Sequence, residues 1–172
     1  YYDSLVNYWR VYAGRTNCAA DICEEFLSTL INVDQYPLKR LASMTASEAT
    51  KVLENSYRAV NIAFIDEWTK YAEAVSIDLY EVIDAIRVRP THSNIRFPGI
   101  GVGGYCLTKD PAFAPASAQQ LLDHQDLDFP FSRLALQINQ AMPLHTMARL
   151  TDLLGGSCLE KKILLLGVSY RQ

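Results

Sequence analysis

The sequence predicts a mainly helical protein, in which one long helix is flanked by two pieces of α/β structure. Three observations support this fold class. The 30 residues from Ser47 to Ser76 contain neither glycine nor proline, and their apolar residues recur at helical spacing. The first 45 residues alternate between patterns typical of strands and of a helix. Near the other end, the run KKILLLGVSY is typical of a buried strand.

The first segment is predicted to form a strand, a helix and a second strand. Val6–Ala13 is rich in valine, tyrosine and tryptophan, which favour strands. Thr16 or Asn17 can cap a helix that continues to about residue 31. Tyr36–Met44 is a second extended stretch. Because this order is typical of an α/β layer, we expect residues 1–45 to be the end of such a domain.

A helical domain is predicted over residues 46–156. Ser47 is the candidate N-cap of the long helix, which would span about 45 Å at 1.5 Å per residue. A helix of this length exceeds what a small domain can cover, so we expect a homodimer through it. Further helices are expected after the candidate cap Asp78, then over Pro111–Leu122 and Phe131–Leu154.

The last of these helices contains Pro143, which removes one helix hydrogen bond and predicts a bend. The glycine pair at 155–156 predicts its end. Residues 157–172 are then expected to be the first strand of another α/β domain.

Composition and charge exclude several classes of function. The net charge is −3 and the pI is about 5.6, which argues against nucleic-acid binding. The 49% of hydrophobic residues are enough for a core, and no apolar run reaches the roughly 18 residues of a membrane span. The four cysteines form no C-x-x-C pair and the three histidines have no metal-binding spacing, so we expect no metal site. With no secretory signal, we expect a cytoplasmic protein with reduced thiols.

The segment FPGIGVGGYCLTKDP, residues 97–111, is the strongest candidate for a functional site. Gly99 to Gly104 match G-x-G-x-x-G, but that fingerprint needs a preceding strand and a helix opening at its last glycine. Pro98 comes directly before it and Cys106 follows it, so we interpret the glycines as a loop whose backbone N–H groups approach a ligand closely. Those N–H groups and Lys109 would favour the thiolate of Cys106.

On the residues alone, Cys106 is either a nucleophile or a buried side chain, and the other three cysteines are interpreted as buried. Lys51 and Asn55 are four residues apart and therefore share one helical face, which is either solvated or functional. Arg87 and Arg89 are either surface charges or contacts for an anion.

Several segments resemble the nucleotide-sugar dehydrogenases, a family that includes UDP-glucose, GDP-mannose and UDP-N-acetylmannosamine 6-dehydrogenases. Residues 98–110 match every fixed position of that family's loop P-G-x-G-x-G-G-x-C-x-x-K-D. KVLENSYRAVNIAFIDEW, INQAMP and KKILLLGVSYR resemble three further family signatures, in the same order. Two positions depart from the family pattern: Asp66 replaces the usual asparagine and Ser76 replaces a common glycine. The SNIRFPGIGVGG run is closer to the UDP-N-acetylhexosamine branch, whereas CLTKDP keeps the Lys-Asp of the UDP-glucose branch.

The resemblance implies a domain organisation. In the family, a helical dimerisation domain joins an N-terminal Rossmann domain, which binds NAD, to a C-terminal nucleotide-binding domain. This chain would then comprise the end of the first (1–45), the whole of the helical domain (46–156) and the first strand of the third (157–172). The NAD fingerprint would lie before Tyr1, so we expect this chain alone to show no NAD-dependent turnover.

The resemblance also implies a reaction, the oxidation of a UDP-hexose C6 alcohol to the uronate by two hydride transfers to NAD. The substrate would be UDP-glucose or a UDP-N-acetylhexosamine. Cys106 would form a thiohemiacetal and then a thioester. Lys51 would stabilise alkoxide or oxyanion charge, Asn55 would position a catalytic water or oxygen, and Asp110 would orient or activate water.

The loop backbone would hold the nucleotide sugar, and Lys109 is expected to contact the cofactor. The residues expected to contact the substrate are Gly99, Gly101, Gly103, Gly104, Tyr105 and Arg89. Two other functions stay open: a non-catalytic dimerisation module with a vestigial cysteine, and a cysteine hydrolase, which would need a histidine close to Cys106.

Overall fold

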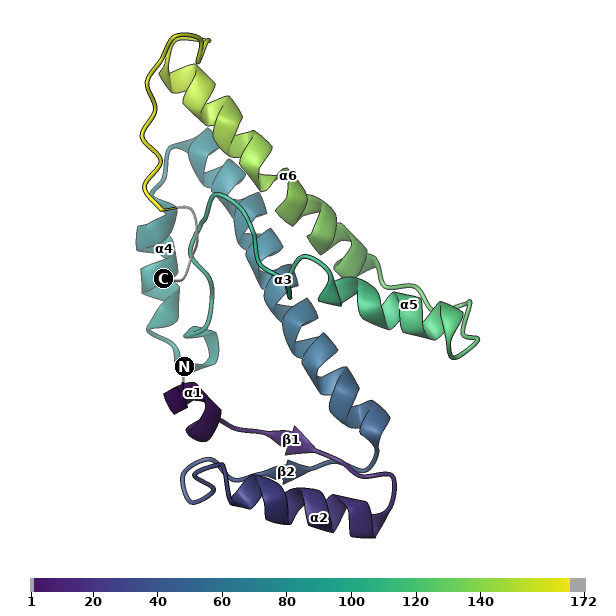
Figure 1. Cartoon of the computed structure of the whole chain (residues 1–172). Coiled ribbons are helices and arrows are strands. Elements are labelled where there is room, and N and C mark those ends of the chain that lie inside the picture. Colours follow the sequence, from purple (N-terminus) through teal and green to yellow (C-terminus); the bar gives the residue numbers. More distant parts are fainter. Residues whose placement is uncertain (1, 168–172) are drawn as a thin grey trace. The chain divides into compact units, whose positions relative to one another are not determined.

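The computed structural model describes residues 2–167 and confirms the mainly helical fold class (Figure 1). The chain divides into two compact units between Glu54 and Asn55, within the longest helix. The elements are α1 (Tyr2–Val6), β1 (Val11–Tyr12), α2 (Asn17–Ser28), β2 (Lys39–Arg40), α3 (Met44–Val75), α4 (Leu79–Arg87), η1 (Pro90–His92), η2 (Asp110–Ala112), α5 (Phe113–Gln120) and α6 (Pro130–Leu153).

The first unit has the predicted strand–helix–strand order, with much shorter strands. β1 and β2 pair in parallel, Val11 opposite Lys39, and α2 is the crossover between them. The Thr16 side chain accepts a hydrogen bond from the Ala19 N–H at 3.1 Å, so Thr16 caps α2 as predicted. The predicted strand over Val6–Ala13 is wrong at its start, because Val6 ends helix α1. Each strand pairs with only one other described strand, and two residues of each take part in the ladder.

Helix α3 is long, as predicted, and begins three residues before the predicted cap. Its 32 residues correspond to about 48 Å. The cap is Ser43, whose Oγ accepts from the Ala46 N–H at 3.1 Å. Ser47 is not the cap, because its own N–H already donates to the Ser43 carbonyl and it lies inside the first turn.

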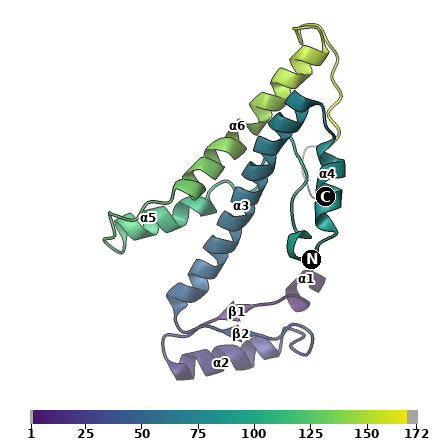
Figure 2. The same cartoon turned by 180° about the vertical axis from the view of Figure 1, so that it is seen from behind.

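In the second unit, α4 and α6 pack on either side of α3 (Figures 1 and 2). On one side Ile65 and Ala72 of α3 form a core cluster with Leu79 and Ile83 of α4. Asp78 caps α4 as predicted, accepting from the Tyr80 N–H at 2.9 Å.

The seam between α3 and α6 is built from small residues. Ala59 and Ala63 of α3 meet Ala135 of α6, and all three are almost fully buried. Alanines allow two helix backbones to approach closely, so polar groups near this seam are shielded from water. Asp66, the departure from the family asparagine, is buried and pairs with Lys70 at 2.6 Å.

Helix α6 runs through Pro143 as one helix, and the glycine pair ends it as predicted. Both Gly155 and Gly156 have positive φ, and the Gly156 N–H donates to the Thr151 carbonyl at 2.9 Å. No described helix has the length and apolarity that crossing a membrane requires.

The predicted C-terminal strand is not formed over residues 161–167. Leu164 and Leu166 are more than 80% exposed, and no described residue pairs with this segment in a ladder. A strand needs a neighbouring strand for its backbone N–H and C=O groups, so an apolar run alone does not produce one. The rest of the predicted strand, residues 168–170, lies outside the described residues, as do 171 and 172.

Candidate functional site

The glycine segment forms an open loop between η1 and η2. No strand leads directly into Gly99 and no helix begins at Gly104, so the segment is not a dinucleotide-binding turn, as its sequence context predicts. From Arg96 to Tyr105, no backbone N–H donates to a backbone carbonyl of the described chain. These N–H groups are therefore available for hydrogen bonds to a ligand.

Two glycines of this loop have structural requirements of their own. Gly104 has a φ of 83°, a backbone conformation that glycine adopts without a steric penalty. At Gly101, an added Cβ would lie 3.2 Å from Cγ of Pro143 in α6. The loop thus packs against α6 at the end of the INQAMP segment, which leaves little room for a side chain at residue 101.

Cys106 lies where the loop turns into η2. Its carbonyl accepts from the N–H groups of Lys109 (3.2 Å) and Asp110 (2.9 Å), and the Thr108 hydroxyl donates to the Gly104 carbonyl at 2.8 Å. These bonds fix the backbone around Cys106, and its side chain is exposed. The interpretation of Cys106 as a buried side chain is therefore wrong, because a ligand can reach the thiol.

The other cysteines are less buried than predicted. Cys18 is exposed, and Cys23 and Cys158 are half-buried. Cys158 lies 3.4 Å from the Thr151 hydroxyl.

A buried amide–carboxylate pair joins α3 to the turn after Cys106. Asn55 is fully buried, and its Nδ2 donates to Oδ2 of Asp110 at 2.6 Å. Asp110 is 6% exposed, and its other oxygen, Oδ1, lies 2.6 Å from Nζ of Lys109. The ammonium offsets the cost of burying a carboxylate. Two of the predicted catalytic residues, 55 positions apart in the sequence, are thus in direct contact.

The second polar atom of Asn55 is a buried acceptor. Because Asn55 Nδ2 faces a carboxylate, which only accepts hydrogen bonds when ionised, Oδ1 must be the remaining atom of the amide. This Oδ1 is buried, and no described residue donates to it. Buried acceptors are normally satisfied, so the geometry calls for a donor such as water or a ligand hydroxyl.

Asn139 is a buried polar residue that was not among the predicted site residues. It lies on α6 within the INQAMP segment, is 5% exposed, and donates from Nδ2 to the Ala59 carbonyl at 3.0 Å. Its Oδ1 likewise has no donor among the described residues. An asparagine at an otherwise apolar helix position was the available signal, because buried amides are retained where they make hydrogen bonds.

The remaining predicted residues are more dispersed. Lys51 belongs to the first unit, where its Nζ pairs with Glu54 at 2.9 Å, so its catalytic role stays a prediction. Lys109, the predicted cofactor contact, binds Asp110 and lies 4.5 Å from the centre of the Phe113 ring. Tyr105 is 88% exposed and Arg89 lies at the start of η1. Both are accessible to a ligand.

The histidine side chains of the described residues make no hydrogen bond to Cys106. His92 bonds to Thr91 and His145 to Glu73, and no hydrogen bond joins either histidine to Cys106. Among the described residues, no group of three or more His, Cys, Asp or Glu side chains could hold a metal ion. The arrangement offers a thiol, a buried carboxylate and amide N–H groups, which suits covalent chemistry on a bound ligand.

Comparisons with known proteins identify relatives of this chain. UDP-N-acetyl-D-mannosamine dehydrogenase from Pyrococcus horikoshii is 31% identical over 99% of this chain and 38% of its own length. NDP-N-acetyl-D-galactosaminuronic acid dehydrogenase from Ralstonia nicotianae is 34% identical over 60% of this chain and 22% of its own length. The chain thus spans well under half of the length of these relatives.

Solved structures of such enzymes share the fold. The Pyrococcus horikoshii UDP-D-ManNAc dehydrogenase structure aligns over 88% of this chain and 33% of its own, with a TM-score of 0.73 and 31% identity. The native UDP-N-acetyl-mannosamine dehydrogenase from Staphylococcus aureus aligns over 87% and 32%, with a TM-score of 0.66 and 27% identity.

The family itself is shown by a match to more than half of the chain. Residues 45–141 match the sequence model described as "UDP-glucose/GDP-mannose dehydrogenase family, central domain". This range contains all but the first residue of α3, the glycine loop, Cys106 and the Asn55–Asp110 pair. The chain therefore belongs to the UDP-glucose/GDP-mannose dehydrogenase family, and residues 45–141 are its central domain.

Proposed function

We propose that this chain is the central part of an NAD-dependent UDP-sugar 6-dehydrogenase, which oxidises a C6 alcohol to a carboxylate through Cys106. The observation that carries the proposal is the buried Asn55–Asp110 contact directly behind the backbone turn of Cys106. A dimerisation module with a vestigial cysteine has no need for a buried carboxylate there, because burying one is costly.

Cys106 can hold the aldehyde intermediate, which would otherwise be hydrated or leave the site between the two oxidations. After the first oxidation, its Sγ bonds to the C6 aldehyde carbon and the carbonyl oxygen gains a proton, giving a thiohemiacetal. The second oxidation removes a hydride from C6 and a proton from the oxygen, which leaves a thioester. The aldehyde is never released, so both oxidations take place on one bound sugar.

The Asn55–Asp110 pair suits the hydrolysis of that thioester. Asn55 Oδ1 is a buried acceptor that can hold a water molecule, and the Asp110 carboxylate beside it can take a proton from that water. Water then adds to the thioester carbon, the C–S bond breaks, and the carboxylic acid and the Cys106 thiol are released. Lys51 would stabilise the developing oxyanion charge.

NAD, when bound, supplies the acceptor for the two hydrides. The described residues of this chain do not fit its binding turn, because the glycine loop lacks the flanking strand and helix. Lys109 also fits a cofactor contact less well than a structural role, since its ammonium already holds the buried Asp110.

The substrate we propose is a UDP-N-acetylhexosamine, with UDP-glucose as the second candidate. The support is that two relatives, which match 99% and 97% of this chain, are named UDP-N-acetyl-D-mannosamine dehydrogenases. The loop N–H groups, Tyr105 and Arg89 would contact the nucleotide sugar, and a guanidinium is suited to a diphosphate.

The test is an assay of the full-length protein that carries this chain. UDP-N-acetylmannosamine, UDP-N-acetylglucosamine and UDP-glucose are each supplied with NAD+, and NADH is counted per sugar consumed. We expect two NADH per sugar, with UDP-N-acetylmannosamine the best substrate. No NADH with any nucleotide sugar would overturn the proposal.

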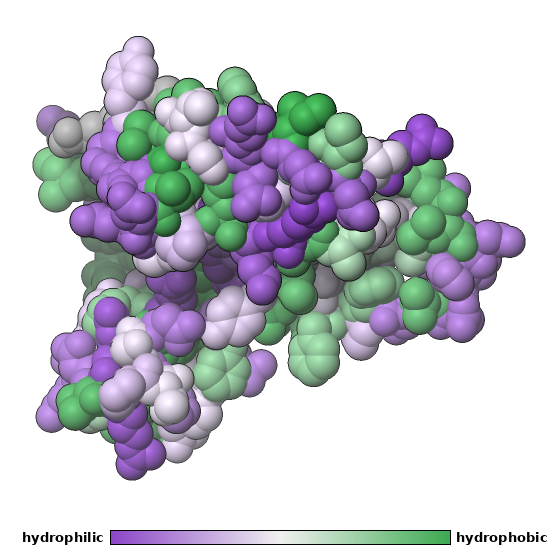
Figure 3. Space-filling model, turned by 90° about the horizontal axis from the view of Figure 1, so that it is seen from below, coloured by the Kyte–Doolittle hydropathy of each residue, from purple (hydrophilic) through white to green (hydrophobic). Residues whose placement is uncertain are grey.

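We also propose that the protein is a homodimer through α3. One face of α3 carries Tyr57, Phe64, Trp68, Tyr71 and Val75, at spacings of 7, 4, 3 and 4 residues, and each is between 42% and 53% exposed. On the face shown in Figure 3, hydrophobic side chains (green) reach the surface among hydrophilic ones (purple). A second copy of α3 offers the same apolar stripe, so a two-fold contact can cover both.

A further inference from the structure

The first residues of the glycine loop, 97–100, are called its stem. Three side chains, Tyr80, Phe97 and Arg87, hold this stem on α4. The ring of Phe97 stacks on that of Tyr80, with centroids 5.5 Å apart and planes 17° apart. The guanidinium carbon of Arg87 lies over the Phe97 ring, 4.7 Å from its centroid. Tyr80 and Arg87 are seven residues apart on α4, so they lie on one face about two turns apart.

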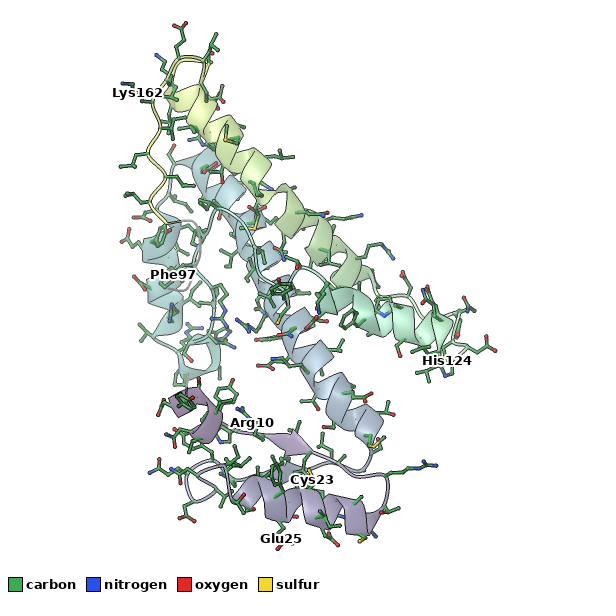
Figure 4. All side chains as sticks on the ribbon, viewed as in Figure 1. Arg10, Cys23, Glu25, Phe97, His124 and Lys162 are labelled. Carbon is green, nitrogen blue, oxygen red and sulfur yellow. The ribbon has the colours of Figure 1, made fainter. Side chains whose placement is uncertain are left out.

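Helix α4 is a firm support for this group. Leu79 and Ile83 are buried against α3, and Asp78 caps the first turn of α4. Figure 4 shows Phe97 beside α4, at the start of the segment that leads to the loop. The residue after it, Pro98, accepts a long hydrogen bond from the Tyr80 hydroxyl at 3.5 Å.

The neighbouring contacts are Ile95, which packs on the α3–α4 core cluster, and Gly101, which lies against Pro143 of α6. Pro98, Gly99 and Ile100 border a cavity of about 370 Å³ rather than a packed interior. Their side of the loop has no backbone hydrogen bond to the described chain, whereas the far side is held by the bonds around Cys106. Arg87 pairs with no carboxylate of a described residue, so the aromatic ring is its identified contact.

We propose that Tyr80, Phe97 and Arg87 are positioning residues, which fix the stem of the glycine loop so that its backbone N–H groups meet the nucleotide sugar in one arrangement. They act through the loop and need not touch the substrate. The consequence for turnover rests on the function proposed above, whereas the consequence for loop order does not. Preorganised N–H groups bind a ligand more tightly, because less conformational entropy is lost on binding.

The first experiment measures loop order in the chain itself, by ¹⁵N relaxation of the Gly99 and Gly101 amides. We expect order parameters near those of rigid backbone, about 0.8, falling below about 0.6 in Phe97→Ala. Phe97→Tyr keeps the stacked ring and should restore the wild-type values. Val88→Ala, at an 81% exposed position beside Arg87, is the control and should change nothing.

The second experiment measures steady-state kinetics in the full-length enzyme. Phe97→Ala and Arg87→Gln should raise KM for the nucleotide sugar about tenfold and about threefold, as the strengths of aromatic and cation–π contacts suggest. Because the Cys106 turn is held separately, kcat should stay within about twofold. Unfolding of a variant would instead lower kcat, and circular dichroism would detect the accompanying loss of helix.

The outcomes separate the two proposals. An inactive wild-type enzyme with a disordered loop in Phe97→Ala would refute the proposed function and leave the stem assignment standing. Unchanged order parameters in Phe97→Ala would overturn the assignment whatever the activity. An unchanged KM despite a disordered loop would show that loop order does not position the substrate, which also overturns it.

Discussion

Replacing Ser76 with glycine should stabilise the protein. Ser76 follows the last residue of α3 and has a φ of 58°, in the left-handed region. Its N–H donates to the Glu73 carbonyl at 3.4 Å, and the Ile77 N–H donates to the Ala72 carbonyl at 3.0 Å. These two bonds define a Schellman motif, in which the position of Ser76 is usually glycine.

The magnitude follows from two opposing terms. A left-handed conformation costs an L-residue roughly 1–2 kcal/mol, and Ser76→Gly removes this cost. Glycine gives the unfolded chain more freedom, which offsets about 0.5–1 kcal/mol. The net gain is about 0.5–1 kcal/mol, or about 1–4 °C in Tm for a chain of this size. The Ser76 side chain is exposed and makes no hydrogen bond within the described chain, so no contact is lost.

Thermal and urea unfolding of the 172-residue chain measure this gain. Ala74→Gly, two residues earlier inside α3, adds the same unfolded-state freedom without relieving strain. It should lower stability by about 0.5–1 kcal/mol. The two variants should therefore shift Tm in opposite directions. A Tm of Ser76→Gly at or below that of the wild type would refute the reasoning.

Three further predictions concern chemistry, assembly and pH. Cys106→Ser in the full-length enzyme should stop the reaction before the carboxylic acid product is formed, since serine is a far weaker nucleophile near neutral pH. Two NADH per sugar at the wild-type rate would contradict the covalent role of Cys106. The wild type should sediment as a dimer at micromolar concentration, with more than about 2,000 Å² buried in total. Trp68→Glu should sediment as a monomer, whereas the control Leu121→Glu, at a 79% exposed position, should stay dimeric. Burial, and then the hydrogen bond to Glu24, raises the pKa of Tyr12 to about 12 from 10.0. The contribution of neutral Tyr12 to stability should thus be full below pH 10 and be lost as pH rises from 10 to 12. Denaturant midpoints at pH 9 and pH 11 measure this loss, which Tyr12→Phe should lack.

The sequence alone determined the features that depend on neighbouring residues. Helix α3 follows from 30 residues without glycine or proline, and Thr16 and Asp78 are caps because their side chains reach N–H groups two or three residues away. The loop at Gly99–Cys106 was identified because the glycine spacing and the thiol lie within ten residues. Such short-range effects need no knowledge of the rest of the fold.

Only the tertiary structure decided which distant side chains meet. Asn55 and Asp110 are separated by 55 residues, and nothing in their local sequences indicates a 2.6 Å contact. Asn139 is buried because alanines at the α3–α6 seam bring two backbones together, and Phe97 is held by a ring on another element. The apolar run at 161–167 shows the converse. Its strand propensity has no effect without a neighbouring strand, because backbone hydrogen bonds between strands are tertiary contacts.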